Sequence, residues 1–180
     1  MESMSIALKS QDVVVLLKLC GYEAAMRPPY SLIASDIGMS RSEINASVKR
    51  LQSARLVNPK ELGELPILAA AEEFLIHAVK YVFPAKRGHF VRGMPTSYAA
   101  EPLNKLIVSG NDPVPVWPFV KGEKKGLSLT PLYPTVPEAA KRDPVLYARL
   151  SMLDAIRDGG ARERKLAEKE LIKSLRNSNG

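Results

Sequence analysis

Several features are scarce or absent in this chain of 180 residues, and each absence excludes a class of protein. The single cysteine, Cys20, excludes an internal disulfide, so we expect a buried thiol in a reducing compartment. No apolar run reaches the roughly 18 residues that a membrane-spanning helix needs. The first residues lack the basic and apolar stretches of a secretory signal. We therefore expect a cytoplasmic protein without membrane contact.

Residues that carry catalysis or hold metal ions are also sparse. The two histidines, His77 and His89, lie in different contexts and no Cys-x-x-Cys occurs, so a zinc site lacks ligands. The sequence has no glycine-rich phosphate loop. Nothing in it marks a serine or cysteine as a nucleophile beside a base. We expect no enzymatic activity, no bound metal and no cofactor.

Basic residues outnumber acidic ones, and the formal net charge of +7 indicates an acidic partner, with nucleic acid as the first candidate. The excess is uneven. Residues 1–83 carry 9 basic and 9 acidic residues, whereas residues 84–144 carry 9 and 5. Within the neutral part, residues 39–60 hold five cations and a single acid, Glu43. That segment offers the local basic surface that phosphate contact requires.

The segment from residue 31 to residue 57 carries the most informative pattern, because it predicts two short helices joined by a tight turn. Ser31 can cap the first helix, since its hydroxyl can accept a hydrogen bond from a free amide of the first turn. An apolar face follows, made of Leu32, Ile33 and Ile37.

Single residues mark the turn and the start of the second helix. Gly38 stands where the chain turns sharply, and a residue without a Cβ adopts the left-handed conformation readily. Ser40 and Glu43 then form a capping-box pattern. This is the helix-turn-helix arrangement, in which the second helix lies in the major groove of DNA.

The second helix, residues 41–53, has two distinct faces. Its apolar stripe consists of Ile44, Val48 and Leu51. The opposite face consists of Ser42, Ala46, Lys49 and Ser53, with Asn45 and Arg50 flanking it. Small residues let the backbone approach base edges, while cations and amides can reach phosphates and bases. A solvated polar face on an ordinary helical hairpin is the alternative interpretation.

These residues resemble the winged helix-turn-helix of bacterial transcription regulators, broadly the MarR-like group. The resemblance covers residues 10–65 and rests on Ala34, Gly38, Ser40 and the phrase LQSARLV at residues 51–57. It implies that a homodimer binds operator DNA and regulates transcription. The DNA-binding residues that it implies are Ser40, Arg41, Ser42, Asn45, Lys49 and Arg50. Of these, Lys49 and Arg50 would anchor phosphates, while Arg41, Ser42 and Asn45 would read base edges.

We predict a mostly α protein with a winged helix-turn-helix DNA-binding domain over residues 1–65. A helix over residues 10–20, capped by a serine, precedes the motif. The wing is expected to be reduced, because the segment after Val57 is too short for two full strands. Residues 66–180 form an extension for dimerisation or partner binding.

The extension has three predicted parts. Pro66 opens a long buried helix over residues 67–83, in which His77 is a packed core histidine. Residues 84–144 hold ten of the 14 prolines and form an irregular, ordered layer, with short strands over residues 114–120. A helical hairpin then ends the chain.

Two basic segments of the proline-rich layer are further candidates for phosphate contact, with a solvated loop as the alternative for the first. Their cations are Lys86, Arg87, His89 and Arg92 in the first segment, and Lys121, Lys124 and Lys125 in the second.

The preferred function is thus a sequence-specific DNA-binding transcriptional regulator. The alternative is an antitoxin-like adaptor on a winged-helix scaffold, whose proline-rich middle region embraces a protein partner.

Overall fold

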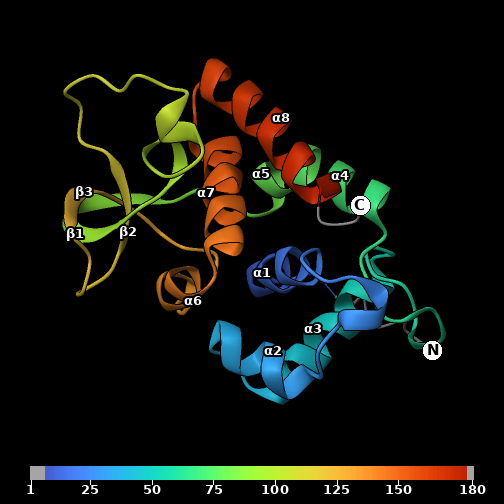
Figure 1. Ribbon diagram of the computed structural model, residues 1–180. Helices are drawn as coiled ribbons and strands as arrows, with labels where there is room; N and C mark the ends of the chain where they lie inside the picture. The colour runs from blue at the N-terminus through green and yellow to red at the C-terminus, as the bar shows by residue number, and fades with distance from the viewer. Residues whose placement is uncertain (1–6, 178–180) are drawn as a thin grey trace.

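The computed structural model describes residues 7–177 and shows a mostly helical protein with a small three-stranded sheet (Figure 1). Mostly α is therefore confirmed as the fold class. The helices are α1 (Ser10–Leu19), α2 (Tyr30–Ile37), α3 (Arg41–Ser53), α4 (Leu68–Glu73), α5 (Val79–Val82), α6 (Val136–Arg142), α7 (Pro144–Asp158) and α8 (Ala161–Asn177). The strands are β1 (Arg87–Pro95), β2 (Pro115–Pro118) and β3 (Lys124–Leu129).

Helix α1 lies in the middle of the protein, between α3 and α7 (Figure 1). Its residues from Val13 to Leu17 are all buried, because α1 packs against α3 and against α7. Its predicted serine cap is wrong by one position, because Lys9 is the N-cap and Ser10 the first helical residue. The Asp12 carboxylate accepts a hydrogen bond from the Lys9 backbone amide at 2.7 Å and so closes this end of the helix.

Helix α2 begins earlier than the sequence predicted. The N-cap is Pro29, whose φ of −62° suits the entry to a helix, so Ser31 lies inside the first turn and does not cap it. Ile33 and Ile37 are buried as predicted, but Leu32 is 55% exposed and does not belong to the apolar face.

A short hairpin follows α3, where the reduced wing was predicted. Val57 and Pro66 form an isolated antiparallel bridge, and the Asn58 amide donates to the Leu65 carbonyl at 2.8 Å. Pro66 therefore belongs to this hairpin rather than to the first turn of the next helix, which begins at Leu68.

The predicted helix over residues 67–83 is a helical run from α4 to α5 with a π-helical turn, Phe74–Ala78, between them. A π turn needs more residues than an α turn, and so it changes which side chains face inward. Leu75 and Val79 are buried, whereas His77 is exposed. The prediction that His77 packs in the core is therefore wrong.

The sheet lies within the proline-rich segment. The predicted strand over residues 114–120 corresponds to β2, but the sequence interpretation missed β1 and β3. Strand β1 pairs antiparallel with both other strands, and β2 and β3 pair in parallel, so the three strands close on one another. Two glycines permit this closure: a Cβ on Gly93 would collide with the Trp117 carbonyl, and one on Gly126 with the Val114 carbonyl.

Helices α7 and α8 form the predicted C-terminal hairpin, and α7 carries the sheet. The buried carboxylate of Asp154 on α7 accepts hydrogen bonds from Thr96 and from the indole of Trp117, at 2.8 and 2.7 Å. Arg157 of α7 pairs with the same carboxylate at 2.7 Å. The opposite charge of Arg157 and the two hydrogen bonds offset part of the cost of burying this carboxylate.

The hydrophobic core is continuous from α1 to α8, and packing alone does not divide the chain at residue 65. Cys20 is buried in this core as predicted, and burial raises the pKa of its thiol to about 12. In the described part of the chain, no helix combines the length and apolar character that crossing a bilayer requires.

We expect Gly93→Ala to destabilise the protein, because the added methyl group forces β1 away from β2. Overpacking of this kind costs about 1–3 kcal/mol. Thermal melts followed by circular dichroism measure the effect. Gly110→Ala is the matched control, since nothing lies within 4 Å of a Cβ at that position. Equal melting temperatures for the two variants would contradict the tight closure of the sheet.

Candidate nucleic-acid interface

The local structure of α3 follows the sequence prediction closely. Gly38 ends α2 with a φ of 68°, in the left-handed region. The Ser40 hydroxyl accepts a hydrogen bond from the Glu43 amide at 3.1 Å, and the Glu43 carboxylate accepts one from the Ser40 amide at 2.7 Å. The predicted capping box and the bounds of this helix, residues 41–53, are confirmed.

The two faces of α3 are also distinct. Ile44, Val48 and Leu51 are buried against the core, as the helical spacing predicted. The candidate residues at the start and on the outer face are exposed to solvent: Ser40, Arg41, Ser42, Asn45, Lys49 and Ser53. We call Arg41, Ser42, Asn45 and Lys49 the outer face of α3. Its side chains are small or cationic, apart from the amide of Asn45.

Arg50 is the exception, and its predicted place beside the outer face is wrong. Its side chain is buried between α3 and α1, where it forms a two-pronged salt bridge with Asp12. The Nε and Nη2 atoms of Arg50 donate to the two carboxylate oxygens at 2.8 and 2.7 Å. Ser47 donates to the same carboxylate at 2.5 Å. Arg50 therefore positions α3 and is not part of its exposed surface.

No local pattern in the sequence indicates this arrangement. Ser47 and Arg50 are three positions apart and lie together on the flank of α3, but their partner is 35 and 38 residues away. In the sequence, Asp12 is simply an acidic residue in the first turn of its own helix, where it suits the helix dipole. A buried carboxylate collects hydrogen-bond donors from elements far apart in the sequence. A helical wheel of α3 alone cannot show such a partner.

Residues from the far part of the chain also hold the turn between α2 and α3. The Tyr133 hydroxyl donates to Glu43 at 2.9 Å, and the Thr135 hydroxyl donates to the Ile37 carbonyl at 2.7 Å. Arg142 donates to the Ser35 carbonyl near the end of α2 at 3.0 Å. The proline-rich segment and α6 thus fix the α2–α3 pair, a contact that the sequence interpretation did not identify.

Positive charge prevails on the exposed side of α3, where Arg41 and Lys49 outnumber Glu43. Glu43, the acidic residue of α3, is occupied by its hydrogen bonds with Ser40 and Tyr133, which lower the pKa of its carboxyl. Among residues 7–177, neither Arg41 nor Lys49 forms a salt bridge. Exposed cations without carboxylate partners are available to phosphates.

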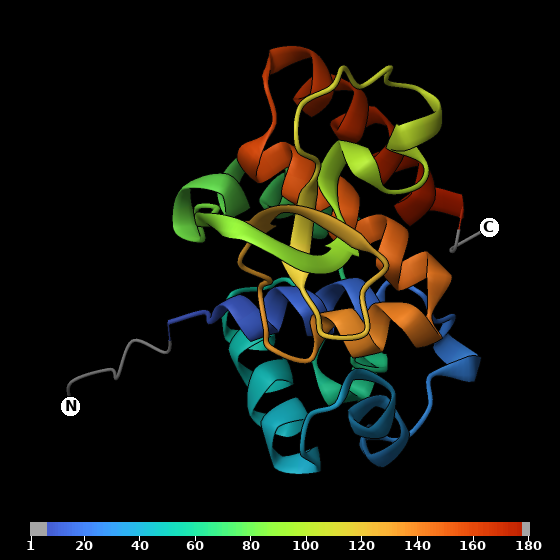
Figure 2. The same cartoon turned by 90° about the vertical axis from the view of Figure 1, so that its left-hand side faces the viewer.

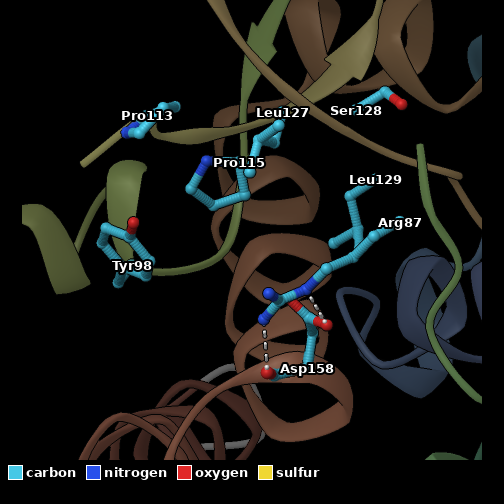
Figure 3. Close-up of a pocket in the computed structure, with 8 residues that line it drawn as sticks. All are labelled: Arg87, Tyr98, Pro113, Pro115, Leu127, Ser128, Leu129 and Asp158. Carbon is cyan, nitrogen blue, oxygen red and sulfur yellow. Dashed lines mark hydrogen bonds and ion pairs between the residues drawn. The ribbon is translucent and has the colours of Figure 1, made fainter. Parts of the chain in front are cut away.

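A second candidate location is the hollow where β1 meets the end of α7 (Figure 3). Arg87 donates from Nε to both carboxylate oxygens of Asp158, at 2.8 and 3.0 Å. The hollow has a volume of about 60 Å³, room for only a few water molecules, and leucine and proline side chains form much of its lining. We interpret it as a junction between the sheet and α7, with its charged groups satisfied.

No metal site competes with these interpretations in the described residues, because no group of three His, Cys, Asp or Glu side chains comes close enough together there. Comparison with known proteins adds no assignment: no protein family, no curated protein and no solved structure matches this chain. Functional inference therefore depends on the geometry of the outer face.

We expect Asp12→Asn to destabilise the protein by about 3 kcal/mol, because it leaves the Arg50 charge buried without a carboxylate. Chemical denaturation of Asp12→Asn, Arg50→Met and the double variant measures the coupling between the two side chains. The double variant should be far more stable than the sum of the two losses predicts. Asp112→Asn, on an exposed loop, is the control. Additive losses would show that the two side chains do not stabilise the protein as a pair.

The lowered pKa of Glu43 predicts a pH dependence. The stabilising contribution of this carboxylate is fully present above its ordinary pKa of 4.5, and it is lost as the pH falls through the lowered value. Glutamine keeps the capping geometry but not the charge. The melting temperature of the unmodified protein should exceed that of Glu43→Gln at pH 6, and the gap should narrow as the pH falls below 4.5. A gap independent of pH would contradict the role of the charge.

Proposed function

We propose that this protein is a sequence-specific DNA-binding regulator of transcription that places α3 in the major groove. The observation that carries the proposal is the outer face of α3, which is solvent-exposed, small or cationic, and held rigidly from behind. A rigid, convex helix with short side chains can approach base edges, and the major groove is wide enough to admit it. The resemblance to winged helix-turn-helix regulators supports the same conclusion.

The proposed roles follow from where each side chain lies. Arg41, Ser42 and Asn45 occupy the first half of α3, the part of a recognition helix that contacts bases. Lys49 lies one turn further along the exposed face, and we assign it to a phosphate. Ser40 sits at the entry of the helix. Arg50 has no direct contact in this proposal and acts by orienting α3.

The short hairpin after α3 stands where a wing would lie in the related fold. Its tip contains Lys60, which is exposed, and the left-handed residues Gly63 and Glu64. With one bridge instead of two full strands, it offers at most a single phosphate contact through Lys60. We also propose a homodimer, since two copies of α3 would read a two-fold symmetric site.

Selection of bound fragments from random duplex DNA tests base reading. We expect the unmodified protein to enrich one motif, and Asn45→Ala to change the preferred base at one position per half-site, because asparagine pairs with adenine through two hydrogen bonds. Enrichment of no motif, or the same motif for both proteins, would contradict the proposal.

The salt dependence of binding tests the phosphate role. Lys49→Gln should weaken binding to every duplex and reduce the slope of log K against log salt by about 0.9, the value for one phosphate contact. Lys169→Gln removes an equal charge from the exposed side of α8, which lies across the protein from α3 (Figure 1), and should leave the slope unchanged. Equal slopes for Lys49→Gln and the unmodified protein would remove this lysine from the interface.

A further inference from the structure

The sheet carries a second exposed basic surface, which the proposed function does not use. Cations of the two basic segments noted in the sequence come together because β1 and β3 pair antiparallel. We call the paired residues of β1 and β3 the β ribbon. In Figure 2 the ribbon crosses the front of the molecule, with the helices behind it.

The pairing register places an aromatic side chain among cations. Phe90 lies opposite Leu127, and Arg92 lies opposite Lys125. Residues two apart on a strand, and residues directly opposite on paired strands, point to the same side of a sheet. These four side chains therefore share one face, and each has neighbours about 5 Å away across the ribbon.

This face is open to solvent, whereas the opposite face closes the sheet. Phe90 is 57% exposed and Leu127 is 37% exposed, and both Arg92 and Lys125 are exposed. Gly93 and Gly126, which alternate with them, are buried in the closure. Phe90 is thus an exposed aromatic side chain, and the next pair along the same face of the ribbon consists of two cations, Arg92 and Lys125.

The ribbon contains no acidic residue, since the strands read RGHFVRGMP and KKGLSL. Arg87 is occupied by Asp158, and Lys124 is paired with Gly93 on the other face, so the cations that remain beside Phe90 are Arg92 and Lys125. Arg92 donates one hydrogen bond to the Gly122 carbonyl at 3.1 Å, which ties its guanidinium to the loop between β2 and β3. A fixed guanidinium has further donors for a phosphate.

We propose that the β ribbon is a second nucleic-acid surface that binds single-stranded nucleic acid, with a base stacked on Phe90 and phosphates on Arg92 and Lys125. Single strands are favoured over duplexes because a stacked base must first be unpaired. Charge complementarity favours nucleic acid over an apolar protein segment, since two cations lie beside the exposed ring and both strands lack carboxylates, with Glu123 just before β3 as the nearest acid in the sequence. This surface operates independently of α3.

The test is fluorescence anisotropy with labelled 12-nucleotide oligouridylate and oligothymidylate on the full chain. Phe90→Ala should weaken binding at least about fivefold, the lower end of the effect of one stacked base. Arg92→Gln with Lys125→Gln should also reduce the slope of log K against log salt by about 1.4, from about 0.7 per contact on single strands. Thermal melts confirm that each variant is folded.

Two controls match these changes. Val108→Ala truncates a fully exposed apolar side chain on a loop, and it should leave oligonucleotide binding unchanged. Lys169→Gln with Lys173→Gln removes the same charge from α8. If the α8 pair weakens binding as much as the ribbon pair, or if Phe90→Ala has no effect, the proposal is overturned, because binding then follows net charge alone.

The α3 variants separate this inference from the proposed function. Asn45→Ala and Lys49→Gln should alter duplex binding and leave oligonucleotide binding intact, while Phe90→Ala should do the reverse. Loss of oligonucleotide binding in the α3 variants would overturn the second surface. Failure of the chain to select a duplex motif would overturn the proposed regulator and leave the ribbon result standing.

Discussion

The buried carboxylate of Asp12 is the interaction on which the candidate interface depends. It accepts a hydrogen bond from the amide that opens α1 and three more from Ser47 and Arg50 of α3. The Asp12 side chain thus caps the start of α1 and also sets the rotation of α3 about its own axis. A rotation of α3 by one residue would turn its outer face through about 100° and bury the groups that we assign to DNA.

Residues near the C-terminal helices also hold the α2–α3 pair, through α1 and α2. Lys18 of α1 bonds to Asp143, the N-cap of α7, and lies 3.2 Å from Asp36 of α2. Burial alone would lower the pKa of this lysine, but the hydrogen bond and charge of Asp143 raise it. Thr135 adds a hydrogen bond to the Ile37 carbonyl at the end of α2. Because these contacts come from distant segments, the orientation of the α2–α3 pair depends on the whole chain.

The parts of the structure that were predictable are those encoded by near neighbours in the sequence. The capping box of Ser40 and Glu43 involves residues three apart, and Gly38 signals its turn alone. Arg50 was misplaced because its partner is 38 residues away. Strand β1 was missed because its pairing depends on β2 and β3, and because its exposed face carries Phe90 and Arg92 together instead of a simple polar alternation. The misplacement of His77 came from a π turn, which a regular helical wheel does not include.

Closure of the sheet limits how the protein can meet its neighbours. Each strand is bonded to both others, so the described sheet presents no long free edge of amides and carbonyls. Such edges are where chains add a strand from another molecule, either to recruit a peptide or to begin aggregation. Any molecule that docks on this part of the protein must therefore recognise side chains. Its affinity will change when single side chains are substituted, whereas an added strand bonded to the backbone would be less sensitive to such substitutions.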